Sequence, residues 1–273
     1  MATDSDTDAR FAGSIPALYE QYFGPLLFEP YAADLAARFG DLQQGVVIEL
    51  AAGTGVVTRA LLKTLAPAVR LVATDLNPAM LTMAASLVSS PALTWQQVDA
   101  QHLPFDDASA EAIACQFGVM FFPDKTASHR EVLRVLRPGG RYVFNVWDSL
   151  EHNEASLIGA RAVAALFPDD PPRFIERTPF GYCDLPAIRR DLEGAGVRRL
   201  SVETVVKVSR APSAEHFAIG LCKGTPLRNE IEVRDAARLD EATAAVTRAL
   251  VARFGSGAFD NAMSAHVVTA FRD

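Results

Sequence analysis

The sequence predicts an α/β protein with a seven-stranded, mostly parallel sheet and helices on both of its faces. Strand-like and helix-like patterns alternate between residues 46 and 147, and such a series builds a parallel sheet. Two further strand patterns, residues 198–209 and 265–271, favour an antiparallel C-terminal hairpin that completes the sheet. With 49% hydrophobic residues, the 273-residue chain can bury a core of this size.

The alternating elements follow one another in a regular order. The predicted strands are "VVIEL" (46–50), "RLVATD" (70–75), "LTWQQVD" (93–99), "AEAIACQFG" (110–118) and "RYVFNVW" (141–147). The helices between them are "GVVTRALLKTL" (55–65), "NPAMLTMAASLV" (77–88) and "KTASHREVLRVL" (125–136). Residues 15–39 show helical spacing interrupted at Pro25 and Pro30, which favours short separate helices. The order is that of a Rossmann-like sheet, whose ligands bind beyond the carboxyl ends of the strands.

The sequence divides into four predicted segments. They are a flexible polar tail (1–13), a Rossmann-like core (14–149), a cap or substrate insertion (150–195), and C-terminal strands of the sheet with inserted helices at 210–255 (196–273). The insertion carries helical patterns at 153–167 and 185–196. Between these patterns, "PDDPPRFIERTPFGYCD" (168–184) is too long and too aromatic for a plain connector, so we interpret it as a lid or substrate wall.

Charge and cysteine content exclude several classes of protein. The net charge of −7 and the pI near 5.3 disfavour a broad phosphate-contacting surface, and therefore nucleic acid as the partner. Cys115, Cys183 and Cys222 form neither a disulfide framework nor a metal-binding pattern, so no metal is expected. No apolar run is long enough to span a membrane, and the acidic N-terminus is unlike a targeting peptide. We expect a cytoplasmic protein.

A loop of small residues follows the first predicted strand. Glu49 ends this strand, and Ala51, Gly53 and Gly55 lie in the loop, where glycine lets a ligand approach the main chain closely. A dinucleotide fingerprint requires a third glycine at position 58, which is Thr58 here. A carboxylate directly before the loop also repels a pyrophosphate. The loop therefore favours a cationic ligand.

Two more acids end the next two strands. Asp75 lies twenty residues after Gly55, the spacing of a carboxylate that accepts hydrogen bonds from ribose hydroxyls. Asp99 is placed to accept a hydrogen bond from an exocyclic amine. With Glu49, these acids predict a ligand that has a cationic group, a ribose and an adenine but no phosphate, which describes S-adenosylmethionine. The alternatives are helix capping for Glu49 and Asp75 and, for Asp99, a loop residue that satisfies backbone amides.

With these motifs the chain resembles class I S-adenosylmethionine-dependent methyltransferases, in the small-molecule group similar to the ubiquinone and menaquinone biosynthesis methyltransferases. The resemblance covers about residues 15–150. The family's E-x-G-x-G-x-G loop corresponds to Glu49, Ala51, Gly53 and Gly55, with alanine at 51 where family members commonly have glycine. The segment "LRVLRPGGRYVFNVW" (133–147) matches the helix, turn and strand that usually follow.

The resemblance implies further contacts to the cofactor. Gln116 and Phe117, at the end of the fourth strand, would contact its methionine portion, and Tyr22 would close over it as part of an N-terminal aromatic pair. The adjoining residues of the predicted cofactor site are Thr54, Leu76, Met80, Ala100 and Gln101. Packing in the core is the alternative for Tyr22, Met80 and Phe117.

The expected reaction is in-line displacement of the methyl group by an O, N or C atom of a small, largely apolar or aromatic metabolite. Such a transfer requires alignment in a dry pocket, and only some acceptors need a base. His152 and Asp148, just after the fifth strand, are the candidate catalytic residues. The predicted acceptor-binding residues are Phe121, Trp147, Phe180 and Tyr182, with ordinary core packing as the alternative.

Two other functions stay open. One is an NAD-linked Rossmann oxidoreductase, and the other is a non-catalytic cofactor-binding or assembly protein. For the second, the amphipathic helix at 240–254 is suited to a dimer surface, so a homodimer is left open. Nucleic-acid methylation is disfavoured because "QFGVMFF" (116–122) stands where amino-methylating enzymes have an Asp/Asn-Pro-Pro-aromatic run.

Overall fold

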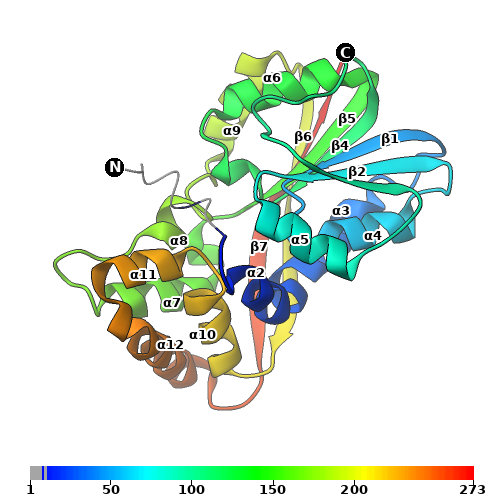
Figure 1. Cartoon of the computed structure of the whole chain (residues 1–273). Helices are drawn as coiled ribbons and strands as arrows, with labels where there is room; N and C mark the ends of the chain where they lie inside the picture. The colour runs from blue at the N-terminus through cyan, green and yellow to red at the C-terminus, as the bar shows by residue number, and fades with distance from the viewer. Residues whose placement is uncertain (1–7, 9–10) are drawn as a thin grey trace. The chain divides into compact units, whose positions relative to one another are not determined.

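The computed structural model describes residue 8 and residues 11–273. Seven strands form one sheet in the order β3-β2-β1-β4-β5-β7-β6 (Figure 1). They are β1 (Gly45–Leu50), β2 (Val69–Asp75), β3 (Leu93–Gln97), β4 (Ala110–Gln116), β5 (Leu136–Trp147), β6 (Arg199–Ala211) and β7 (Phe259–Phe271). The predicted flexible tail, residues 1–13, falls mostly on residues 1–7 and 9–10, which lie outside the described residues.

Strand pairing brings three predicted site residues to one edge of the sheet. β1 pairs in parallel with β2 and β4, β2 with β3, and β4 with β5. β7 runs antiparallel to β5, with Trp147 opposite Ala265. Parallel strands end at the same edge, so Glu49, Asp75 and Gln116 all lie at the carboxyl edge. The predicted mixed sheet with antiparallel C-terminal strands is confirmed.

The helices of the described residues are of three kinds. The α-helices are α2 (Ile15–Leu18), α3 (Glu29–Ala37), α4 (Val56–Thr64), α5 (Pro78–Leu87), α6 (Lys125–Val135), α7 (Glu154–Ala164), α8 (Phe174–Arg177), α9 (Leu185–Ala195), α10 (Ala214–Lys223), α11 (Leu227–Asp235) and α12 (Leu239–Phe254). η1 (Tyr19–Phe28) is a π-helix, and η2 (Val119–Phe121), η3 (Leu150–His152) and η4 (Ala236–Arg238) are 3₁₀-helices.

Helices cover both faces of the sheet. α4 and α5 contact β2, whereas α6 contacts β5 and packs on α9. Figure 1 shows α3, α4 and α5 together on one face, with α6 and α9 on the other. Because its two faces are both covered, β1 buries Val47, Ile48 and Leu50 in succession. This explains why the apolar residues of "VVIEL" occupy successive positions instead of alternating ones, with Glu49 the one polar residue of the segment.

The N-terminal helical region is continuous, so the predicted interruption at Pro25 is wrong. α2 leads into η1, which contains Pro25, and η1 leads into α3, which has Pro30 in its first turn. At the end of η1 the Glu29 amide donates to the carbonyl of Gly24, five residues back, instead of the usual four. The chain therefore stays helical past a residue without an amide hydrogen by changing its hydrogen-bond pattern. Pro30 likewise lies within this continuous helical stretch, in the first turn of α3.

The chain comprises two compact units. The first contains residues 148–181 and 206–264 with the described part of residues 1–30, and the second contains residues 31–147, 182–205 and 265–273. The loops after β1, β2, β3 and β4 belong to the second unit, whereas the segment after β5 begins the first unit's residues 148–181. In the first, α12 packs on α7 and α10 and buries Val246 and Leu250. The apolar face of the predicted helix 240–254 is thus already covered within its own unit, so this face does not form a dimer surface. No helix among the described residues is long and apolar enough to cross a membrane.

Candidate functional site

Glu49 is a buried acid at the end of β1. It is 1% exposed, and its Oε2 accepts a hydrogen bond from Thr58 Oγ1 at 2.7 Å. Burial raises the pKa of Glu49 to about 8, although the bond from Thr58 opposes the rise. A nearby positive charge would stabilise the ionised carboxylate of Glu49, because it would compensate for the hydration that burial removes.

Asp75 joins the loop after β1 to the loop after β2. One carboxylate oxygen accepts the Gly53 amide at 2.8 Å and the other accepts the Asn77 amide at 2.8 Å. Burial raises the pKa of this carboxyl group, and both amide bonds oppose the rise. The side chain is thereby fixed in direction, while each oxygen keeps a lone pair for a ligand.

The two glycines of the β1 loop differ in what surrounds them. Gly53 and Gly55 both have left-handed backbone, with φ of 56° and 84°. A Cβ on Gly53 would meet nothing within 4 Å, so the main chain there is open to a ligand. A Cβ on Gly55 would lie 3.2 Å from the Trp95 ring and 3.4 Å from Ala84 Cβ. Gly55 is thus required by packing of the loop on the protein itself, whereas Gly53 is the position left free for a ligand.

Ala51 is accommodated by Gly118, a residue that the sequence did not single out. Ala51 has left-handed backbone with φ of 52°, which glycine adopts more readily than alanine. A Cβ on Gly118 would lie 2.5 Å from Ala51 Cβ and 2.8 Å from Cys115 Sγ. The methyl group of Ala51 therefore occupies space that a side chain at 118 would need. This contact explains how the loop takes alanine where family members commonly have glycine.

Asp99 is partly engaged within its own turn. Its Oδ1 accepts the Gln101 amide at 2.9 Å, and its Oδ2 lies 3.8 Å from His102 Nδ1. Gln101 in turn accepts the Asp124 amide at 3.1 Å, which links this turn to the start of α6. Oδ1 of Asp99 thus has the role given by the alternative interpretation, that of a loop residue whose side chain satisfies a backbone amide. Contact of the other with adenine stays a prediction.

Phe117 is held by contacts that join β4, β5 and α3. Its backbone is left-handed, with φ of 49°, and its amide donates to Asn145 Oδ1 at 3.0 Å. Its ring stacks on Trp147 with centroids 3.9 Å apart, and Tyr31 meets both rings edge-on. Asn145 also donates to Gln116 Oε1 at 3.4 Å. Tyr31 and Asn145 were not predicted, because no local motif marks them.

Other predicted cofactor residues flank these groups. Leu76 is 55% exposed, which is unusual for leucine and leaves apolar surface beside Asp75. The predicted residues that are buried are Thr54, Met80 and Ala100. The second unit thus brings the strand-end acids and the open Gly53 backbone together. Contact of each residue with the cofactor stays a prediction.

The two candidate catalytic residues form a pair in the first unit. His152 Nδ1 lies 3.1 Å from Asp148 Oδ2, and the imidazole is 67% exposed while the carboxylate is 13% exposed. Ser264 Oγ donates to the same carboxylate at 2.8 Å, and the Ser149 amide donates to it at 2.6 Å. The Asn153 side chain bonds both the amide and the carbonyl of Ser264, each at 3.1 Å. Asp148 can therefore hold Nδ1 as the protonated nitrogen and leave Nε2 as an acceptor.

The predicted aromatic residues are distributed over both units. In the first unit, the Tyr22 ring packs on His216 with centroids 4.7 Å apart, and Phe180 is buried. In the second, Tyr182 donates to Asp191 at 2.7 Å, and Lys125 Nζ lies 4.9 Å from the Tyr182 ring centre. Burial and the Asp191 carboxylate raise the pKa of the Tyr182 hydroxyl well above its ordinary value, so it acts as a hydrogen-bond donor and not as a base. Phe121 ends η2.

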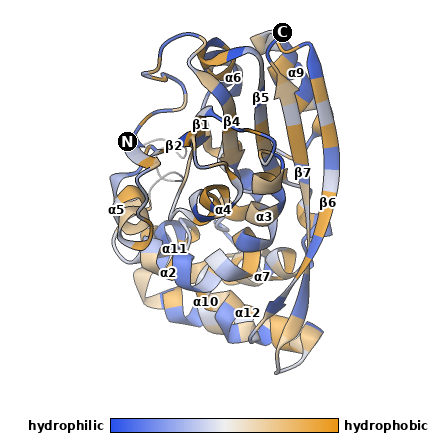
Figure 2. Cartoon of the chain, turned by 90° about the vertical axis from the view of Figure 1, so that its right-hand side faces the viewer, coloured by the Kyte–Doolittle hydropathy of each residue, from blue (hydrophilic) through white to orange (hydrophobic). Residues whose placement is uncertain are grey.

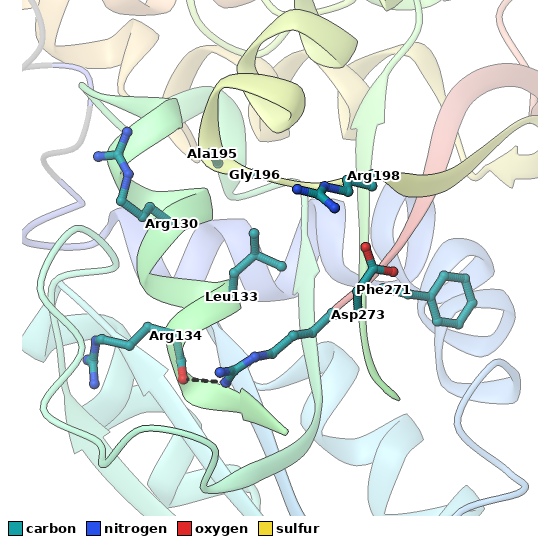
Figure 3. A pocket seen from close by; sticks show the side chains of 9 residues that line it. Arg130, Leu133, Arg134, Ala195, Gly196, Arg198, Phe271 and Asp273 are labelled. Carbon is teal, nitrogen blue, oxygen red and sulfur yellow. Dashed lines mark hydrogen bonds between the residues drawn. The ribbon is translucent and has the colours of Figure 1, made fainter. Parts of the chain in front are cut away.

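A pocket of about 390 Å³ lies near the C-terminal end of β7 (Figure 3). Phe271, which lines this pocket, pairs with Arg141, whereas Trp147 lies at the carboxyl end of β5 and pairs with Ala265. The pocket therefore lies at the opposite ends of the strands from Glu49 and Asp75. Arg134 is bound by Glu131 and Asp107, and Arg272 donates to the carbonyl of Arg134. Arg134 and Arg272 are therefore engaged in interactions that stabilise this part of the fold. Among the described residues, no cluster of His, Cys, Asp or Glu is arranged to hold a metal ion.

Comparison with known proteins identifies the family of this domain. Residues 48–144, which contain the end of β1, all of β2, β3 and β4, and the loops after these strands, match a family model described as a methyltransferase domain. The chain contains a class I S-adenosylmethionine-dependent methyltransferase domain. S-adenosylmethionine is the methyl donor of this family, which confirms the predicted family and cofactor. The NAD-linked oxidoreductase alternative is thereby set aside.

Curated relatives match part of the chain. The demethylmenaquinone methyltransferase of Deinococcus radiodurans is 40% identical over 99 residues, which are 36% of this chain and 41% of the relative. The ubiquinone/menaquinone biosynthesis C-methyltransferase UbiE of Caulobacter vibrioides is 34% identical over 117 residues, 40% of this chain and 46% of the relative. The chain thus spans less than half the length of these relatives.

Solved structures share the fold. Phosphoethanolamine N-methyltransferase 2 of Haemonchus contortus, in complex with S-adenosyl-L-methionine, has a TM-score of 0.63 and 15% identity over 100% of this chain and 60% of its own. The YcgJ protein of Bacillus subtilis has a TM-score of 0.56 and 18% identity over 89% and 98% of the two chains. At these identities the likeness shows the fold of the methyltransferase domain and not its substrate.

Proposed function

We propose that the chain transfers the methyl group of S-adenosylmethionine to a small, largely apolar or aromatic metabolite. The observation that carries the proposal is the hydrogen bond from the Gly53 amide to the Asp75 carboxylate. The Gly53 backbone is open to a ligand, and buried Glu49 lies at the end of the neighbouring strand. Two relatives act in quinone biosynthesis according to their names, and quinone precursors are aromatic. The acceptor class proposed here agrees with them.

The residues present fit the cofactor. The carboxylate of Asp75 has a fixed direction suited to ribose hydroxyls, and Glu49 supplies negative charge suited to the ammonium or sulfonium group. Asp99 would accept from the adenine amine, with Leu76 and Met80 beside the ring. S-adenosylmethionine supplies the methyl group that is transferred. The other proposed contacts are with Tyr22, Ala51, Thr54, Gly55, Ala100, Gln101, Gln116 and Phe117.

In this proposal the protein mainly orients the reactants and excludes water. Phe117 and Trp147 form a rigid stacked pair at the carboxyl edge of β4 and β5, which excludes water from the backbone beneath it. Trp147, with Phe121, Phe180 and Tyr182, would contact the acceptor, since aromatic side chains bind apolar rings and stabilise a transferring cation. Residues 150–195 and parts of 210–255 would form the acceptor cap.

A base is available for acceptors that must lose a proton. Asp148 holds the Nδ1 side of His152, and the Nε2 atom is on an exposed imidazole that can take a proton from a phenol or an amine. The carboxylate also stabilises the imidazolium that results. Ser264 and the Ser149 amide orient the Asp148 carboxylate for this role.

The proposal is tested by binding and turnover together. The protein is titrated with S-adenosylmethionine, then incubated with a panel of phenols, quinols, amines and, as competitors, tRNA and peptides, with methylated products detected by mass spectrometry. Binding with transfer to a phenol, quinol or small amine supports the proposal. Binding without transfer to any acceptor favours the non-catalytic alternative, and transfer to tRNA or peptide alone contradicts the small-molecule acceptor.

A further inference from the structure

The pocket near the C-terminal end of β7 is rich in arginine. Four of the residues that line it are arginines, namely Arg130, Arg134, Arg198 and Arg272, and Asp273 is the one acid among them. The chain as a whole has 33 acids against 26 lysine and arginine residues. All residues of the pocket belong to the second unit. The pocket therefore concentrates positive charge against the balance of the whole chain.

Three separate parts of the chain supply these arginines. Arg130 and Arg134 lie on α6, Arg198 directly precedes β6, and Arg272 directly follows β7. Figure 2 shows the C-terminus beside α9 and the beginning of β6, where the ribbon is hydrophilic. In Figure 3 the arginines of α6 and Arg198 stand on different sides of the pocket. Like charges repel one another, so a bound anion would stabilise this arrangement.

Two of the four arginines are engaged by the protein and two are not. Two carboxylates bind Arg134, and Arg272 donates to a backbone carbonyl. Within residues 11–273, the side chains of Arg130 and Arg198 have neither an ion pair nor a hydrogen bond, and both are exposed. An unengaged guanidinium offers five N–H donors in a planar fork that matches the oxygens of a carboxylate or a phosphate. Arg130 and Arg198 are therefore available to a ligand.

The pocket also has an apolar wall. Phe271 and Leu133 line it, and both are half-buried. The guanidinium of Arg199 lies 4.1 Å from the centre of the Phe271 ring, which holds the ring in place. The pocket volume of about 390 Å³ lies in the range of sites for small organic molecules. An inorganic anion would fill only part of this space, so the volume and the apolar wall favour an organic anion.

We propose that this pocket binds a phosphate monoester of an aromatic or apolar molecule, with the phosphate on Arg130 and Arg198 and the apolar part on Phe271 and Leu133. A phosphate monoester has three terminal oxygens and can bond two guanidinium groups at once, whereas one arginine already satisfies both oxygens of a carboxylate. The pocket lies at the opposite ends of the strands from the proposed cofactor site. The ligand would therefore be neither methyl donor nor acceptor, and the proposal does not depend on the methyltransferase activity.

Calorimetric titration of the full-length protein with phenyl phosphate tests the proposal. Phenyl phosphate joins an aromatic ring to a phosphate, and inorganic phosphate and benzyl alcohol each supply one of these parts. Saturable one-to-one binding of phenyl phosphate is expected, about tenfold or more tighter than that of either part, because only the ester reaches both the arginines and the apolar wall. Saturating S-adenosylmethionine is expected to leave this affinity unchanged. Displacement of the probe by S-adenosylmethionine would put the probe in the cofactor site and overturn the proposal.

Substitution of the unengaged arginines locates the bound probe. Arg130→Gln and Arg198→Gln are each expected to weaken phenyl phosphate binding by about tenfold, and Arg198→Lys, which keeps the charge but loses the planar fork, by less. Arg70→Gln, at an exposed arginine of β2 outside the pocket, is the matched control and is expected to bind as wild type does. Thermal unfolding checks that each variant is folded. No saturable binding by wild type, full affinity in both Arg130→Gln and Arg198→Gln, or an equal loss in Arg70→Gln would overturn the proposal.

Discussion

The carboxylate of Asp75 accepts a hydrogen bond from the backbone amide of Gly53 at 2.8 Å, so the end of β2 is tied to the loop after β1. Its second oxygen accepts the Asn77 amide at the same distance. The acid proposed to hold the ribose and the glycine proposed to lie against the cofactor therefore form one rigid assembly. A ligand that binds there loses little free energy in ordering the site.

Removal of the Asp75 carboxylate should weaken binding of S-adenosylmethionine. Asp75→Ala deletes a charge-assisted contact and loosens the Gly53 loop, which should cost about 1.5 to 3 kcal/mol, or roughly tenfold to over a hundredfold in Kd. Calorimetric titration measures the change, with Asp260→Ala, an exposed acid paired with Arg210, as the matched control. Unchanged affinity in a folded Asp75→Ala protein would show that Asp75 does not bind the cofactor.

Cofactor affinity should rise with pH up to about pH 8. The pKa of Glu49 is raised to about 8, so below this pH the site must release a proton before it offers a negative charge to the cofactor. The slope approaches about tenfold per pH unit on the acid side. Glu49→Gln should bind more weakly near and above pH 8, where the wild-type group is ionised, and should lose this part of the slope, which calorimetry at several pH values measures. An identical slope in Glu49→Gln would assign the titration to another group.

The same group makes a prediction for the free protein. Because the folded pKa lies above the ordinary value of 4.5, the folded state binds more protons between these limits. The contribution of Glu49 to the free energy of unfolding is therefore full below pH 4.5 and is lost as the pH rises through 8. Urea unfolding of wild type and Glu49→Gln should diverge in this window. Parallel stability curves would show that Glu49 titrates normally.

Substitution of the two loop glycines should separate binding from stability. Gly53→Ala meets no neighbour within 4 Å, so it should fold with a backbone strain of about 1 kcal/mol but bind the cofactor far more weakly. Gly55→Val places side-chain atoms against Trp95 and Ala84 and should lower the melting temperature instead. Thermal unfolding and calorimetry on both variants measure the split. If Gly53→Ala binds normally, the cofactor lies elsewhere.

The Asp148 and His152 pair should act on turnover and not on cofactor binding. With an acceptor that must lose a proton, His152→Gln should lower kcat by about 10² to 10⁴. Asp148→Asn should also lower kcat, because Nδ1 of His152 loses the carboxylate that orients the imidazole. Glu151→Gln, on the same 3₁₀-helix, is the control. Full activity of His152→Gln would show that no base from this pair is used.

The sequence was sufficient for the parts of the structure that local patterns encode. Continuous apolar strands, their terminal acids and the small-residue loop predicted the sheet and the cluster of Glu49, Asp75 and Gly53. Within the predicted helical insertion at 210–255, the bounds of α11 were not predicted, because this helix buries little beyond Leu227 and Ile231 and so shows weak periodicity. At Pro25 the sequence predicted a break, whereas a π-helix accommodates the proline.

Contacts between distant positions could not be predicted from one sequence. Ser264 bonds Asp148 across 116 positions, and Tyr31 meets Phe117 and Trp147 edge-on. The close packing of Ala51 against Gly118 is likewise visible only in the structure, since no sequence motif indicates that these two residues are in contact. Such pairs depend on strand order and register, which fix the distance between segments far apart along the chain.

The most direct test of the central claim is equilibrium binding of S-adenosylmethionine by wild type and Gly53→Ala, with NAD as the competing ligand. Wild type should bind S-adenosylmethionine saturably and one-to-one, Gly53→Ala should bind it far more weakly, and NAD should not displace it. Undetectable binding by the folded wild-type protein, or equal affinity in Gly53→Ala, would contradict the claim that the strand-end loop of this domain holds the methyl donor.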